Sequence, residues 1–91
     1  MATFMALITY GDRAKRDEAR PKHREYLQKL LDEGKLHESG PFTDDSGAAI
    51  IYHAADAAEA RDLLENDPYS AAGALSDTRI AKWNILFSDN E

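Results

Sequence analysis

The stretch that decides the fold is KLHESGPFTDDSGAAIIYHAADAAEARDLLEND, residues 35–67. It predicts a short strand over residues 35–39, a turn rich in Gly, Pro, Asp and Ser, and a second strand over residues 48–53. Asp56 followed three residues later by Glu59 has the pattern of a capping box, so a helix begins directly after the second strand. Two strands joined by a turn and then a helix therefore form the centre of the chain.

The flanking sequence adds one helix and two strands. An apolar, β-rich run predicts a strand over residues 3–10. Pro21 suits the first turn of a helix, so we expect the first helix to begin there, with Gly34 stopping it. After the second helix we expect a turn over residues 69–73 and a last strand over residues 78–87.

The resulting order is β-α-β-β-α-β in 91 residues, which is room for a single domain spanning residues 1–91. This order favours an α+β, ferredoxin-like plait, in which a four-stranded antiparallel sheet carries both helices on one face. The first strand is also apolar on its other side, at Met5 and Leu7. Because so apolar a face is unfavourable in water, we expect a homodimer that packs two sheets face to face as an α/β barrel.

Composition narrows the function classes. The chain has no cysteine, which excludes disulfides, thiolate-held metals and a thiol nucleophile, and fits a reducing, cytoplasmic setting. The net charge of −6 argues against a nucleic-acid or membrane-surface partner. The apolar N-terminus lacks a basic leader, no apolar run is long enough to cross a membrane, and no glycine-rich nucleotide loop or metal-ligand spacing occurs. We therefore expect no cofactor and no metal.

Three features should meet at one edge of the sheet: His23 in the first turn of the first helix, the turn over residues 40–47, and the exit of the second helix at Asp67. A helix N-terminus disfavours a protonated imidazole, so His23 would stay neutral and accept a proton as a general base. A carboxylate would fix its tautomer; Asp67 is the first candidate, Asp45 the second and Asp44 the third. The alternative is a half-buried histidine without a catalytic role.

The same edge offers candidate substrate contacts. Gly40-Pro41 either lets a ligand approach the backbone or simply forms a tight strand exit. Tyr69 could stack on a ring substrate, donate a hydrogen bond, or only pack. Arg20 or Lys22, in a basic stretch, could hold an anionic group, although a solvated charged loop is the alternative.

An ordered set of short motifs resembles the YciI-like (YCII-related) family over roughly residues 4–83. The motifs are Pro21-Lys22-His23, Tyr26-Leu27, Gly34-Lys35-Leu36, Gly40-Pro41 with Asp44-Asp45, Asp67-Pro68-Tyr69 with Ala72-Gly73, and Lys82-Trp83. The resemblance implies a ferredoxin-like fold, a homodimeric α/β barrel, and an active site centred on a histidine–aspartate pair, which His23 and Asp67 match. One family member resembles a dehydrochlorinase of a chlorinated hydroxyhydroquinone, and related dimeric barrels include muconolactone isomerases and cofactor-free monooxygenases.

The sequence therefore predicts a small cofactor-independent enzyme that moves a proton on a small, cyclic, anionic substrate by elimination or isomerisation. The alternatives are a non-catalytic small-molecule-binding or accessory dimer, and a purely structural dimerisation module. The candidate catalytic residues are His23, Asp67 and Asp45, and the candidate substrate-binding residues are Arg20, Gly40, Pro41, Asp44 and Tyr69.

Overall fold

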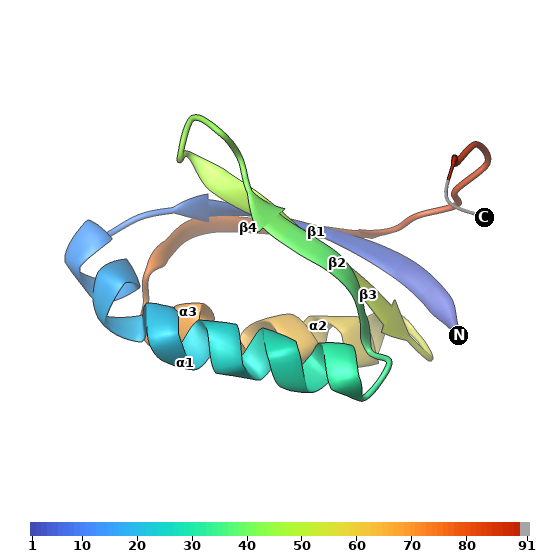
Figure 1. The fold of residues 1–91 in the computed structure, drawn as a ribbon, viewed down its shortest axis with the longest axis horizontal. Coiled ribbons are helices and arrows are strands. Elements are labelled where there is room, and N and C mark those ends of the chain that lie inside the picture. The colour runs from blue at the N-terminus through green and yellow to red at the C-terminus, as the bar shows by residue number, and fades with distance from the viewer. Residues whose placement is uncertain (90–91) are drawn as a thin grey trace.

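A computed structural model describes residues 1–89 as a four-stranded sheet covered on one side by helices (Figure 1). The elements are β1 (Ala2–Tyr10), α1 (Arg13–Asp32), β2 (Leu36–Pro41), β3 (Gly47–Ala54), α2 (Ala57–Glu65), α3 (Pro68–Ala71) and β4 (Leu75–Lys82). The strands lie in the order β2-β3-β1-β4 and every neighbouring pair is antiparallel. This arrangement confirms the predicted ferredoxin-like plait.

The core lies between the sheet and the helices. Alternate residues of β1 point toward the helices and are buried, beginning with Phe4, and their neighbours on β3 include Ile50 and Tyr52. Leu30 of α1 and Leu63 of α2 close this core from the helical side. The period-two pattern of β1 thus decides which sheet face receives the helices.

The prediction that the first helix begins at Pro21 is wrong, because α1 begins eight residues earlier. Asp12 caps it, its carboxylate accepting a hydrogen bond from the Lys15 backbone N–H at 3.0 Å. Arg16 and Ala19 are buried, so the helical turns before Pro21 are stabilised by packing against the rest of the protein. Pro21 lies exposed within the helix, and the first turns are set at an angle to the rest (Figure 1).

The end of the chain also differs from expectation. The last strand does not cover residues 78–87; it is β4, Leu75–Lys82, and pairing with β1 stops at Phe4. Directly after β4, the Trp83 backbone N–H still donates to the Thr3 carbonyl at 2.8 Å, and the residues that follow form no strand up to residue 89. The turn expected over residues 69–73 contains the short helix α3, because Asp67 caps a new turn at once. Within residues 1–89, no helix combines the length and apolar character that a membrane span requires.

Gly47 fixes the approach of β3 to β1. A Cβ atom at this position would lie 1.9 Å from the Ile8 carbonyl oxygen, well inside van der Waals contact. The offending group is backbone in a central strand, so it cannot move aside without disturbing the sheet. Only glycine permits the pairing that begins at Thr9 and Gly47 and brings the β2–β3 turn close to α1.

We expect Gly47→Ala to lower the free energy of unfolding by about 2–3 kcal/mol, because the methyl group forces β1 and β3 apart. Urea denaturation followed by circular dichroism measures the change. Gly40→Ala is the matched control, since a Cβ there has nothing within 4 Å. Equal stability of the two variants would contradict the assignment of Gly47 as the point of close approach.

Candidate active site

His23 and Asp67 are in direct contact, although 44 residues separate them in the chain. His23 projects from the middle of α1, and Asp67 lies at the junction of α2 and α3. The distance from His23 Nδ1 to Asp67 Oδ1 is 2.7 Å, and the side chains are 12% and 1% exposed. Because a carboxylate only accepts, Nδ1 carries the proton of this bond and Nε2 of a neutral ring keeps its lone pair.

The predicted position of His23 in the first turn of a helix is wrong, since α1 begins at Arg13. The positive end of the helix dipole acts mainly within the first turn and does not reach the middle of α1. The helix N-terminus therefore does not account for a neutral imidazole at His23. The Asp67 carboxylate is the group that orients His23 in the structure.

Asp67 has two roles in the structure. Its Oδ1 accepts a hydrogen bond from the Tyr69 backbone N–H at 2.9 Å, which caps α3, and the same oxygen binds His23. The Tyr69 ring lies parallel to the imidazole, with centroids 3.8 Å apart and an interplanar angle of 8°. One face of Tyr69 is therefore occupied by His23, so Tyr69 positions the histidine and that face is closed to a substrate ring.

A pocket of about 370 Å³ adjoins the pair. Its lining brings together residues from β1, α1, the end of β2 and α3, far apart in the chain. Of the predicted site residues, His23, Arg20, Gly40, Pro41, Asp45 and Tyr69 line it; the further lining residues are Tyr10, Arg24, Leu27, Ser39 and Ala48. This volume matches a single-ring metabolite better than a large cofactor.

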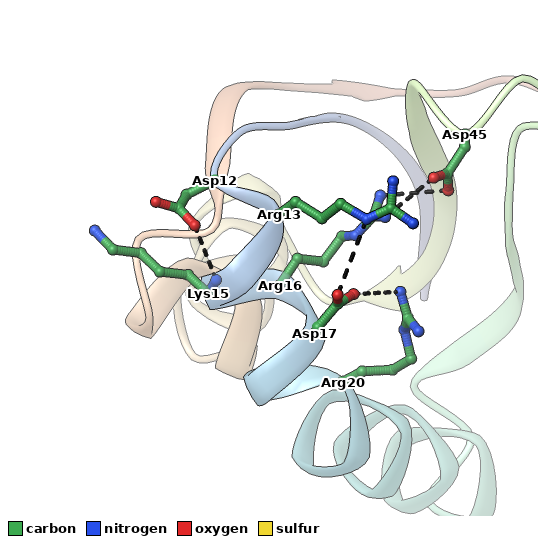
Figure 2. A network of polar contacts seen from close by, with 7 residues as sticks. All are labelled: Asp12, Arg13, Lys15, Arg16, Asp17, Arg20 and Asp45. Carbon is green, nitrogen blue, oxygen red and sulfur yellow. Dashed lines mark hydrogen bonds and ion pairs between the residues drawn. The ribbon is translucent and has the colours of Figure 1, made fainter.

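The two turn aspartates are not partners of His23, contrary to the second and third predictions. Asp45, at the tip of the β2–β3 turn with a φ of 62°, binds Arg16 through both carboxylate oxygens at 3.0 and 3.3 Å (Figure 2). The Asp44 carboxylate accepts from the Ser46 backbone N–H instead, which holds the turn. Hydrogen bonding by the Ser46 side chain, followed by that of its backbone, lowers the pKa of Asp44. Asp44 does not line the pocket, so its predicted contact with substrate has no geometric support.

Arg16 is a buried cation that sequence reasoning missed. Its side chain is 5% exposed, and its guanidinium carbon lies 4.1 Å from the centre of the Tyr10 ring. Tyr10 meets the edge of Tyr69 at 6.0 Å, and burial, followed by the influence of Tyr69, raises the pKa of the Tyr10 phenol. The chain Asp45–Arg16–Tyr10–Tyr69 thus joins the β2–β3 turn to the ring stacked on His23. The sequence analysis could have found Arg16 only by beginning the first helix at Arg13 instead of Pro21.

Basic residues of α1 line two separate hollows. Arg20 and Arg24 line the pocket beside His23, whereas Lys22 lines a hollow of about 670 Å³ between α1 and α3. Arg20 also binds Asp17 at 3.1 Å, as Figure 2 shows. The larger hollow contains neither His23 nor Asp67, so the smaller pocket is the candidate active site. Of the two cations considered for an anionic group, the structure places only Arg20 beside His23.

We expect Asp45→Asn to lower the free energy of unfolding by about 1–2 kcal/mol, because it leaves the buried Arg16 guanidinium without its counter-ion. Chemical denaturation measures the loss. Asp44→Asn is the matched control in the same turn, since an asparagine carbonyl can accept the same Ser46 hydrogen bond. If the two variants are equally stable, the Arg16–Asp45 pair does not hold the turn to α1.

Comparison with known proteins agrees with this architecture. The uncharacterized protein YjpA of Bacillus subtilis (strain 168) is 35% identical over 63 residues, which are 69% of this chain and 73% of the relative. The structure of 5-chloro-2-hydroxyhydroquinone dehydrochlorinase (TftG) from Burkholderia phenoliruptrix AC1100, in complex with 2,5-dihydroxybenzoquinone, superposes with a TM-score of 0.77, at 26% identity over 90% of this chain and 93% of that one.

A second solved structure, an antibiotic biosynthesis monooxygenase, has a TM-score of 0.64 at 15% identity over 94% of this chain and 99% of that one. At that identity the likeness concerns the fold alone. The family model of the YCII-related domain matches residues 2–84, nearly the whole chain. The protein therefore belongs to the YCII-related domain family.

Proposed function

We propose that the protein is a small enzyme that needs no cofactor and in which His23, oriented by Asp67, transfers a proton on a small, cyclic, anionic substrate. The observation that carries the proposal is the 2.7 Å contact between His23 Nδ1 and the buried Asp67 carboxylate at the wall of a ring-sized pocket. This contact leaves Nε2 as the nitrogen that accepts the proton. The Asp67 charge stabilises the imidazolium that results.

The chemistry of the pocket supports an acidic ring as substrate. Arg20 and Arg24 lie on the same side of α1 as His23, and the carboxylate of Asp45 in the pocket wall is already paired with Arg16. The pocket therefore offers cations and no uncompensated carboxylate of its own among the described lining residues. The similar TftG structure holds 2,5-dihydroxybenzoquinone, a flat ring with acidic hydroxyl groups. We assign the same ligand class to this pocket.

The proposed step is elimination or isomerisation. Nε2 of His23 takes a proton from an acidic O–H or C–H group, and the electron pair left behind moves into the ring. On a hydroxylated ring with a halide substituent, the electron pair first takes up a proton at the carbon that carries the halide. Loss of a second hydroxyl proton then expels the halide and leaves a quinone, so the net change is loss of one hydrogen halide, without an external oxidant or reductant. Arg20 and Arg24 stabilise the anionic form of the ring, and a base so positioned contributes about 10²–10⁴-fold in rate.

We expect His23→Gln to reduce turnover about 10²–10⁴-fold, because glutamine cannot accept the proton. The assay incubates the protein with 5-chloro-2-hydroxyhydroquinone and with halogen-free hydroxylated rings. Chloride release and uptake of solvent deuterium report on elimination and on proton transfer. Asp67→Asn is expected to lose most of the same activity, since the amide carries no negative charge to stabilise the imidazolium and no longer holds the imidazole in one orientation.

His37→Gln is the matched control. His37 pairs with His53, their ring centroids 5.3 Å apart, and neither lines the pocket. If His37→Gln and His23→Gln have the same effect, or if no ring substrate is turned over by the wild type, the proposal is overturned.

One observation favours a second candidate, a non-catalytic small-molecule-binding dimer. His23 is largely buried between Tyr69 and Asp67, as a histidine with a purely packing role would be. In that case a ring ligand such as 2,5-dihydroxybenzoquinone binds without turnover, and its affinity survives His23→Ala. Isothermal titration calorimetry of the wild type and this variant separates the two functions.

We also propose that two copies pair through the sheet face that carries no helices. Met5 and Leu7 lie on this face, and Leu7 remains 38% exposed in the single chain, whereas Ile51 on the same face is already buried. Figure 1 shows that all three helices lie on the opposite side. A second copy presents the same apolar face, so a face-to-face dimer is self-complementary and removes both faces from water.

Leu7→Glu is expected to convert the dimer to a monomer at tens of micromolar protein, because it places a charge at the centre of the buried face. Sedimentation velocity measures the change. Leu31→Glu is the control, since Leu31 is 48% exposed on α1, on the helical side. A wild type that sediments as a monomer would exclude this assembly.

A further inference from the structure

Behind the His23–Asp67 pair lie two buried polar atoms that no contact explains. Asp67 uses only Oδ1 for its two hydrogen bonds, and its Oδ2 is buried without a partner among residues 1–89. The hydroxyl of Tyr52, whose residue is 0% exposed, is likewise buried without a partner in the described residues. Native proteins nearly always pair such groups, because a buried polar atom without a partner loses its hydrogen bonds to water.

The two atoms belong to the same part of the core. Tyr52 projects from the centre of β3 toward the helices, where Tyr26 of α1 donates its hydroxyl to the Leu63 carbonyl of α2 at 2.6 Å. Asp67 lies one helical turn after Leu63. Burial raises the pKa of the Tyr52 phenol, and the Asp67 carboxylate, followed by Tyr26, raises it further.

A buried donor and a buried acceptor are therefore both without partners in the described residues. Tyr52 can donate its hydroxyl proton, and an ionised Asp67 Oδ2 can only accept. No direct hydrogen bond joins them within residues 1–89. One water between them would satisfy both, as internal waters commonly do for buried polar groups.

We propose that one internal water links the Tyr52 hydroxyl to Asp67 Oδ2 and that Tyr52 is a positioning residue of the His23–Asp67 pair. The relay then runs from β3 through Asp67 to α1. It stabilises the negative charge of Asp67 and holds Oδ1 toward His23 and the Tyr69 N–H. His23 from α1 and the Tyr69 backbone N–H from α3 contact this carboxylate. The phenols of Tyr26 from α1 and Tyr52 from β3 interact with it electrostatically.

The role of Tyr52 in catalysis rests on the proposed function, but the relay can be tested without any substrate. A crystal structure of the full chain is expected to show a water within hydrogen-bond distance of both Tyr52 Oη and Asp67 Oδ2. A well-resolved structure in which no water touches both atoms overturns the proposal.

The second test is an NMR titration of the His23 imidazole in full-length variants. Tyr52→Phe removes a donor that partly neutralises Asp67, so the titration midpoint of His23 is expected to rise by about half a pH unit or more. Tyr26→Phe is the matched control: it also removes one phenol, but one whose partner is the Leu63 carbonyl. We expect a clearly smaller shift in that variant.

The shift must also depend on Asp67. In an Asp67→Asn background, Tyr52→Phe should leave the His23 midpoint unchanged, since the charge that it screens is gone. Equal shifts for Tyr52→Phe and Tyr26→Phe, or a Tyr52 effect that persists without the Asp67 charge, refute the relay. A coupled titration without turnover overturns only the proposed enzyme function, whereas turnover with an uncoupled titration overturns only the relay.

Discussion

The site depends on one buried carboxylate. Asp67, 1% exposed, lies where α2 ends and α3 begins, and its Oδ1 holds both the α3 backbone and the His23 imidazole of α1. Removing a carboxylate from water is costly unless several donors meet it. The turn of chain between the two helices and the middle of α1 are thereby brought to a common point. The stacked Tyr69 ring then allows the imidazole little freedom to turn.

A second constraint acts from the opposite side of the pocket. Gly47 lets β3 approach β1 closely, and the turn that precedes it carries Asp45 to Arg16. Arg16 in turn lies over the Tyr10 ring, which meets the edge of Tyr69. The pocket is consequently framed by two ion or hydrogen-bonded pairs, His23–Asp67 and Arg16–Asp45. Both join α1 to segments that follow it in the chain, so the placement of this long helix controls the whole site.

The proposed base and the proposed water relay both depend on a fixed position of the Asp67 carboxylate. A histidine is useful as a base when its second nitrogen is held by an acceptor whose own position is fixed. The backbone N–H of Tyr69 fixes one oxygen of Asp67, and the relay through Tyr52 accounts for the other. Arg20 and Arg24 of α1 line the pocket beside the imidazole, and the Tyr69 ring covers one face of that imidazole.

The sequence by itself determined the order of the four strands and the two longer helices, the plait, and the edge of the sheet at which His23, the β2–β3 turn and Asp67 lie. These follow from local signals: the alternation of β1, the Asp56 cap that accepts the Glu59 N–H, and the turn residues. Local signals misplaced the start of α1, because the rule for Pro21 outweighed the Asp12 cap and the burial of Arg16 is not visible in the local sequence. They ranked Asp67 before Asp45 and Asp44 but left all three open as partners of His23. Only tertiary structure decided that Asp45 pairs with Arg16 and Asp67 with His23, since partner choice depends on distances between segments that the chain separates by 29 and 44 residues.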